Sequence, residues 1–213
     1  MGRSSPRSIL FHQGEAAASR AILASGIILA GGRSSRMGRD KALLQTGDET
    51  LLGRTTRILS AVVDEVLVVG RSELPSECLH AIAMPDDEPD TGPMGGIATG
   101  LQHMRSERAA VVACDLPFLS PAVPRFLLES LDGFDAVVPR VYGRIQPTCA
   151  VYARGCLQTF RQHIARGEYR LGHALSTLQV RWIEEELSAV DHGHRSFLNP
   201  NTIEEWQELR RQM

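Results

Sequence analysis

The sequence has 213 residues, 43% of them hydrophobic, and a formal net charge of −2 at neutral pH. A chain of this length fits one large domain or two small ones, and it can bury roughly 70% of its unfolded surface. The balanced charge excludes a strongly basic surface for nucleic acid or anionic lipid, and no run of about 18 apolar residues is present to span a membrane. We therefore expect a cytoplasmic protein that binds neither nucleic acid nor membranes.

The N-terminal residues differ from the rest of the chain. Residues 1–24 contain basic and polar positions but no apolar stretch long enough for a secretory signal. We expect a partly disordered N-terminal extension over residues 1–24 and a single domain over residues 25–213. The cysteines form no CxxC pair and match no common zinc spacing, so we expect buried, unreactive thiols. These cysteines are Cys78, Cys114, Cys149 and Cys156.

Short apolar runs alternate with helically spaced apolar residues along most of the chain. This alternation predicts an α/β domain of three layers with a mainly parallel sheet. The less regular stretch 140–196 is expected to form a lid or a subdomain. The predicted strands are residues 27–30, 65–70, 81–84, 109–113, 135–139, 147–152 and 180–184. The predicted helices are residues 51–63 with Thr50 as the cap, 94–104, 122–130, 153–166, 172–178 and 202–211.

The stretch from Gly26 to Lys41, GIILAGGRSSRMGRDK, is a candidate phosphate site. An apolar strand runs into a glycine-rich turn, whose backbone N–H groups an anion can approach because glycine has no Cβ. Arg33, Arg36 and Lys41 supply positive charge. The spacing is neither that of a P-loop nor that of a GxGxxG dinucleotide loop. The alternative is an ordinary turn with solvated arginines.

Two acidic features are further candidates. Asp115 directly follows the predicted strand 109–113, where ligands collect in open α/β sheets, so it suits Mg²⁺; a helix cap is an equal alternative. An acidic run contains Asp86, Asp87, Glu88 and Asp90. It suits a metal site or a guanine site, because a carboxylate can accept hydrogen bonds from the N1–H and the exocyclic amine of guanine. The alternative is a solvated turn. The pair His192 and His194 lacks a partner motif, so we expect an exposed loop.

Several blocks in the same order resemble one enzyme family. Leu29-Ala30-Gly31-Gly32-x-Ser34-x-Arg36-Met37-Gly38-x-Asp40-Lys41 is similar to the signature of nucleotidyltransferases that make molybdenum cofactor dinucleotides, and most of all to the guanylyltransferases. The resemblance continues in GPMGG (92–96), CDLPF (114–118), QPT (146–148) and FLNPNT (197–202). It implies a Rossmann-like nucleotidyltransferase fold and transfer of GMP from GTP to molybdopterin, with release of pyrophosphate.

The resemblance also implies site residues and partners. The GTP-binding residues would be Leu29, Ala30, Gly31, Gly32, Lys41, Asp115 and Asp86, with Asp87 as the alternative to Asp86. The catalytic residues would be Arg36 and Lys41, which stabilise pyrophosphate, and Asp115, which binds Mg²⁺ together with Asn201. The molybdopterin side would comprise Gln146, Pro147, Thr148, Arg170 and Asn199, although Asn199 is also placed near the metal. The implied partners are GTP, molybdopterin with or without molybdenum, other proteins of cofactor synthesis, and acceptor molybdoenzymes.

One loop departs from the family pattern. Family members often have an asparagine after the second strand, whereas this chain has Val68-Val69-Gly70-Arg71. We expect Arg71 to take part in GTP binding instead. The rival functions are a molybdopterin cytidylyltransferase, whose loop usually has LAAG in place of LAGG, and a sugar-phosphate nucleotidyltransferase, whose GxGxRL-type loop is absent. A non-catalytic nucleotide-binding module is the third rival, disfavoured by the joint presence of Lys41, Asp115 and Asn201.

Overall fold

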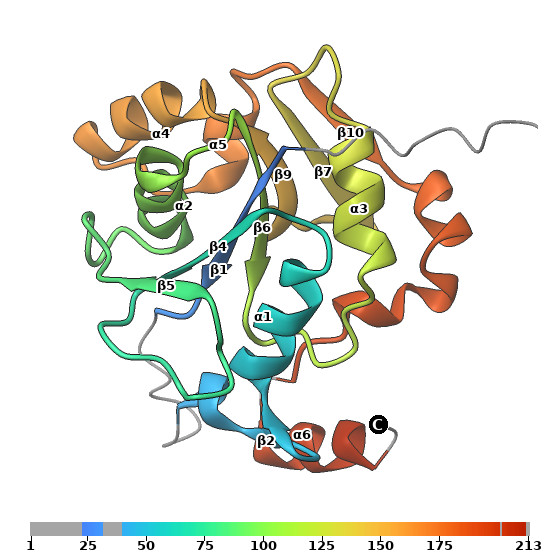
Figure 1. Cartoon of the computed structure of the whole chain (residues 1–213). Helices are drawn as coiled ribbons and strands as arrows, with labels where there is room; N and C mark the ends of the chain where they lie inside the picture. The colour runs from blue at the N-terminus through green and yellow to red at the C-terminus, as the bar shows by residue number, and fades with distance from the viewer. Residues whose placement is uncertain (1–22, 32–39, 201, 212–213) are drawn as a thin grey trace, which may run out of the picture.

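The structure is a computed structural model, and it describes residues 23–31, 40–200 and 202–211 (Figure 1). The predicted disorder of the N-terminal extension lies outside these residues, as do Gly32, Arg36 and Asn201. Ala24 is buried, and its backbone N–H donates to the Asp64 carboxylate at 3.0 Å. No helix in the described part of the chain is long and apolar enough to cross a membrane.

The main sheet confirms the expected α/β class with mostly parallel strands. Its order is β10-β7-β9-β6-β1-β4-β5, with β8 added against β7. The pairs of β1 with β4 and β6, of β4 with β5, and of β7 with β10 are parallel, whereas β9 runs antiparallel to both of its neighbours. The strands are β1 Ser25–Leu29, β4 Glu65–Val69, β5 Ala81–Met84, β6 Arg108–Ala113, β7 Ala136–Val141, β8 Arg144–Ile145, β9 Cys149–Ala153 and β10 Val180–Ile183.

Helices cover both faces of this sheet and give the predicted three layers (Figure 1). Helices α1 (Leu51–Ser60) and α3 (Ala122–Glu129) lie on one face, and α2 (Pro93–His103), α4 (Cys156–Ala165) and α5 (Leu171–Leu175) lie on the other. Successive side chains of the central strand β1 pack into the apolar cores on opposite faces of the sheet, because side chains alternate across a strand. Ile28 packs with α1 and α3, while Ile27 packs with α2 and α4, so β1 is apolar on both faces.

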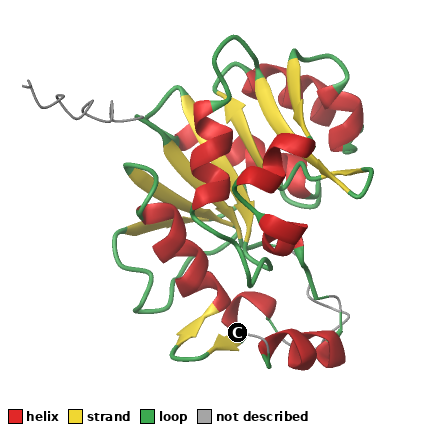
Figure 2. Cartoon of the chain, turned by 90° about the vertical axis from the view of Figure 1, so that its right-hand side faces the viewer, coloured by secondary structure: helices red, strands yellow, loops and turns green. Residues whose placement is uncertain are grey.

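A small unit lies beside the main sheet. The short strands β2 (Gln45–Thr46) and β3 (Glu49–Thr50) form an antiparallel hairpin that the apolar pattern did not predict. Figure 2 shows this hairpin beside the C-terminal helix α6 (Ile203–Arg210). Trp206 of α6 and Leu51, the first residue of α1, are both buried and form a separate apolar cluster, against which the partly buried Leu44 packs.

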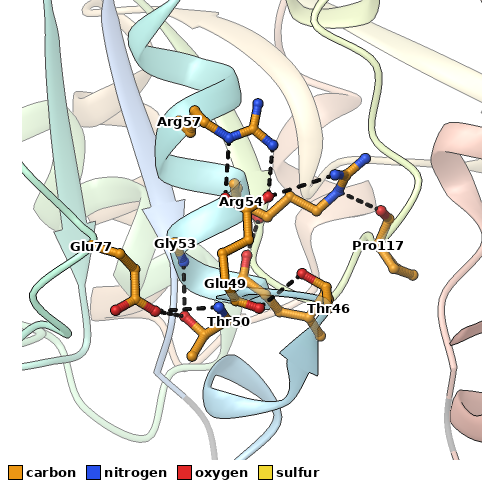
Figure 3. A network of polar contacts seen from close by, with 10 residues as sticks. Thr46, Glu49, Thr50, Gly53, Arg54, Arg57, Glu77 and Pro117 are labelled. Carbon is orange, nitrogen blue, oxygen red and sulfur yellow. Dashed lines mark hydrogen bonds and ion pairs between the residues drawn. The ribbon is translucent and has the colours of Figure 1, made fainter. Parts of the chain in front are cut away.

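Thr50 begins α1 as the sequence predicts. Its hydroxyl oxygen accepts a hydrogen bond from the Gly53 N–H at 3.0 Å, the usual role of a threonine cap. The Glu77 carboxylate then accepts from the Thr50 hydroxyl at 2.7 Å and from its N–H at 3.2 Å (Figure 3). These bonds, the first above all, lower the pKa of the Glu77 carboxyl.

The structure corrects two expectations for the second half of the chain. The stretch 140–196 is not a separate lid, because β9 fills the sheet position between β6 and β7. Helix α4 begins at Cys156 rather than at residue 153, because Ala153 still pairs with Arg108 in the sheet.

The prediction of buried free thiols is confirmed for all four cysteines.

The turn after β4 depends on a close backbone contact. Gly70 has a φ of 92°, and a Cβ placed there would lie 2.4 Å from the Cα of Gly31. This distance is far below van der Waals contact, so Gly70 lets the β4 turn pack directly on the glycine-rich turn after β1.

We predict that Gly70→Ala destabilises the fold more than Gly133→Ala does. Gly133 also has a positive φ, 85°, but no atom lies within 4 Å of the added methyl group. Both variants incur backbone strain, and only the first overpacks, which should add about 1–3 kcal/mol to the loss. Urea denaturation measures both; equal losses in the free energy of unfolding would contradict the contact.

Candidate active site

Three segments that are distant in the sequence meet at Lys41. Its ammonium group lies 3.7 Å from the Asp115 carboxylate and donates a hydrogen bond of 2.8 Å to the carbonyl oxygen of Pro200. The side chains of Lys41 and Asp115 are 21% and 22% exposed, so both are partly buried and still accessible to a ligand. The predicted grouping of Lys41, Asp115 and the segment after Phe197 is therefore present.

The sheet explains why these groups meet. In the parallel pair of β1 with β6, Leu29 is opposite Ala113, so both strands end at the same edge. The Cys114 N–H then donates to the Leu29 carbonyl at 3.2 Å, and the Ala30 N–H donates to the Val69 carbonyl at 3.0 Å. Leu29, Ala30 and Gly31 thus lie beside Asp115. This edge is where open α/β sheets bind ligands.

Arg71 contacts the segment that carries Lys41. The short 3₁₀ helix η1 (Lys41–Leu43) begins at Asp40, whose carboxylate accepts from the Ala42 N–H at 3.0 Å. The guanidinium of Arg71 forms an ion pair with this carboxylate. The Arg71 side chain is mostly buried, and its Nε has no hydrogen-bond acceptor in the described part of the chain. Arg71 therefore fixes the start of the lysine segment.

Asp86, rather than Asp87, faces the end of β1. One Asp86 carboxylate oxygen accepts from the Thr99 hydroxyl and from the Glu88 N–H, each at 3.0 Å. The other oxygen receives no hydrogen bond from the described residues, and a Cβ at Gly96 would lie 3.9 Å from it and 3.0 Å from Leu29. The carboxylate of Asp87 instead pairs with His103, 2.8 Å away, on the exposed side of α2.

The predicted molybdopterin residues flank the other side of Asp115. The Thr148 carbonyl accepts from the Ala113 N–H at 2.7 Å, and the carbonyl of Pro147 accepts from the buried Tyr152 hydroxyl at 2.7 Å. Gln146 is held by its N–H, which donates to the carbonyl of Pro139 at 2.8 Å.

Two more residues of the predicted molybdopterin set are exposed, namely Arg170 and Asn199. Arg170 precedes α5, where a Cβ at Gly172 would lie 3.6 Å from Ile145, next to Gln146. Asn199 immediately precedes Pro200, the residue whose carbonyl binds Lys41. Gln146, Pro147 and Thr148 thus lie next to the end of β6 on its β9 side, whereas Asp86 follows β5, on the other side of β1.

The residues at this edge of the sheet fit Mg²⁺ only if the substrate supplies some of the metal ligands. No group of three or more His, Cys, Asp or Glu residues in the described ranges could hold a metal ion. Mg²⁺ needs only one or two protein carboxylates, because phosphates and water complete its shell. Asp115 supplies one such carboxylate. Burial, the largest cause, raises the pKa of the neighbouring Cys114 thiol to about 12, which excludes a thiolate nucleophile at neutral pH.

Three supporting contacts have no signal in the sequence. Thr99 is a buried threonine within α2, and nothing in its surroundings indicates the bond to Asp86. Asp40 belongs to the glycine-rich motif, but its ion pair with Arg71 depends on the turn after β4, which is distant in the sequence. Arg54 of α1 donates its Nε–H to the Pro117 carbonyl at 2.7 Å and so fixes the loop after Asp115 (Figure 3).

The fold and the site together define a nucleotidyltransferase, and comparisons with known proteins identify the family. Residues 26–183 match the model of the MobA-like NTP transferase domain. The chain therefore belongs to the MobA-like NTP transferase family.

Curated and solved relatives agree with this assignment. The chain is 36% identical over 182 residues to a probable molybdenum cofactor guanylyltransferase of Pelotomaculum thermopropionicum, covering 85% of this chain and 89% of that protein. It is also 36% identical over 184 residues to a molybdenum cofactor guanylyltransferase of Desulfosudis oleivorans, covering 85% and 91%. The crystal structure of molybdopterin-guanine dinucleotide biosynthesis protein A from Archaeoglobus fulgidus superposes with a TM-score of 0.75 at 25% identity, covering 90% and 100%.

We predict that Arg71→Ala weakens GTP binding by roughly tenfold, equivalent to about 1.4 kcal/mol, because Asp40 and the start of the Lys41 segment lose their anchor. Arg105→Ala is the matched control, since Arg105 pairs with Glu65, the first residue of β4, at the other end of the strands. Isothermal titration with GTP measures both variants. Unchanged affinity in Arg71→Ala, or an equal loss in the control, would contradict this role.

Proposed function

We propose that the protein transfers GMP from GTP to the terminal phosphate of molybdopterin and releases pyrophosphate. The observation that carries this proposal is the meeting of Lys41, Asp115 and the Pro200 carbonyl at the end of the sheet, with Asp86 beside the neighbouring strand. Membership of the MobA-like family and the guanylyltransferase names of its relatives support the same reaction.

The reaction needs alignment and charge compensation rather than a protein nucleophile. A terminal phosphate oxygen of molybdopterin forms a bond to the α-phosphorus of GTP, and the bond from that phosphorus to the β-phosphate bridging oxygen breaks. The bonding electrons leave with pyrophosphate. Lys41 and Arg36 would stabilise the leaving pyrophosphate, together with backbone N–H groups of the glycine-rich loop.

Asp115, together with Asn201, would hold Mg²⁺ at the triphosphate. When bound, the metal neutralises negative charge on the phosphates. In the absence of nucleotide, the ammonium of Lys41 compensates the Asp115 carboxylate across 3.7 Å. Lys41 thereby holds this carboxylate at the end of β6.

Asp86 would select the base. The free oxygen of its carboxylate can accept from the N1–H or the exocyclic amine of guanine, and cytosine has no equivalent pair of donors. The Thr99 hydroxyl fixes the other oxygen and so limits rotation of the carboxylate. This assignment, together with Gly31 in place of the alanine usual in cytidylyltransferases, favours GTP over CTP.

Gln146, Pro147, Thr148, Arg170 and Asn199 would bind molybdopterin, either metal-free or loaded with molybdenum. The position of Gln146, Pro147 and Thr148 on the β9 side of β6 supports this, because an acceptor phosphate bound there would lie across Asp115 from a base bound at Asp86. A cytoplasmic location, and contacts with other proteins of cofactor synthesis or with acceptor molybdoenzymes, stay predictions.

We predict that Asp115→Asn lowers turnover by roughly 10²–10³-fold, because one charged contact to the transition state is lost while the fold is kept. Asp132→Asn is the matched control, since Asp132 is highly exposed and pairs with Arg108 at the other end of β6. Pyrophosphate release from GTP with molybdopterin and Mg²⁺ measures both. Full Mg²⁺-dependent turnover in Asp115→Asn would overturn the assignment of the metal ligand.

A further inference from the structure

A cavity lies outside the proposed substrate site. It has a volume of about 400 Å³ and lies between α1, the loop after β6 and the 3₁₀ helix η3 (His192–Phe197). The residues that decide its chemistry are Arg54, Phe118, Ser120, Asp191, His192 and Arg195. None of them belongs to the nucleotide, metal or molybdopterin set. The volume falls within the range of about 300–1,000 Å³ that is typical of small-molecule sites.

Arg195 brings positive charge to this cavity. Its guanidinium carbon lies 4.8 Å from the centroid of the Phe118 ring. A ring face attracts a cation without using its N–H donors, so these donors stay available to a ligand. Among the described residues Arg195 forms no ion pair, and it is exposed at the cavity.

Arg54 brings a second guanidinium from a distant part of the chain. Its Nε–H donates to the Pro117 carbonyl at 2.7 Å, which fixes the side chain against the loop (Figure 3). The nearest carboxylate, that of Glu49, is 3.7 Å from one Arg54 nitrogen but only 2.6 Å from Arg57. The hydrogen bond from Arg57 is the main cause of the lowered pKa of Glu49. Glu49 thus compensates Arg57 first, and Arg54 only in part.

One carboxylate among the remaining polar groups offsets part of this charge. The Asp191 carboxylate is buried, and its oxygens accept from the Ser196 N–H at 3.2 and 3.4 Å. The oxygen of the Ser120 hydroxyl accepts from the Ala122 N–H at 3.3 Å, so its own hydrogen remains available as a donor. The cavity therefore presents hydrogen-bond donors and two guanidinium groups against the one carboxylate of Asp191.

We propose that this cavity binds a phosphate group between Arg54 and Arg195, separately from the nucleotide. Guanidinium groups pair with carboxylates and phosphates alike. Two guanidinium groups from different segments favour phosphate, because its tetrahedral oxygens accept from several directions whereas the two oxygens of a carboxylate are coplanar. The phosphate comes either from inorganic phosphate or from a small phosphate ester.

The test is a calorimetric titration of the full chain with inorganic phosphate, at constant ionic strength and with saturating GTP to occupy the nucleotide site. We expect phosphate to bind, and Arg195→Ala to weaken the binding by about tenfold or more, since it removes hydrogen bonds from a charged donor. Arg125→Ala is the matched control, because Arg125 is an exposed arginine that donates to the Ala61 carbonyl and does not line the cavity. It should leave the affinity unchanged.

A parallel titration with glycerol 3-phosphate distinguishes the sources of the phosphate group, since tighter binding of the ester indicates an organic phosphate and tighter binding of inorganic phosphate indicates the free ion.

Three results would overturn the proposal. They are complete displacement of phosphate by GTP, an equal loss of affinity in Arg125→Ala, and binding of glutamate as tight as that of phosphate. The thermal midpoint of each variant, compared with wild type, verifies that it is folded.

Discussion

The contact of the Lys41 ammonium with the Asp115 carboxylate is the interaction on which the site depends. Five strands and two α-helices separate Lys41 from Asp115 along the chain, and the two residues meet because β1 and β6 are parallel and end together. The Pro200 carbonyl adds the C-terminal segment to the same ammonium group. One cation thus gathers the three parts of the chain that the proposed reaction requires.

Close backbone packing makes room for this contact. Gly70 allows the turn after β4 to lie against Gly31, and Arg71, the next residue, then reaches Asp40 beside Lys41. On the other face of the sheet, a Cβ at Gly100 would lie 2.6 Å from Ile27, so α2 can approach β1 closely only because this residue is glycine. That approach brings Thr99 and Asp86 to the end of β1. The glycines therefore set both the phosphate side and the base side of the site.

Much of this could be predicted from the sequence, because local chemistry fixes it. The apolar runs and the Thr50 cap predicted most strands and the start of α1, and the motif residues Lys41 and Asp115 were placed together correctly. The direction of β9 could not be predicted, since this antiparallel strand is buried on both faces and so has the continuous apolar run that is typical of a parallel strand. The hairpin of β2 and β3 has only two residues in each strand, which is too short for a periodic pattern. The choice between Asp86 and Asp87 depends on Thr99, which is distant in the sequence.

The measurement that tests the central claim most directly is nucleotide-dependent thermal stabilisation of the wild type and of Lys41→Ala. With Mg²⁺, GTP at 100 times its Kd should add about 2.7 kcal/mol to the stability of the wild type, and CTP and ATP at the same concentration should add less. Lys41→Ala should lose most of the GTP effect. A larger shift with CTP, or an undiminished GTP shift in Lys41→Ala, would contradict a guanine-nucleotide site built around Lys41.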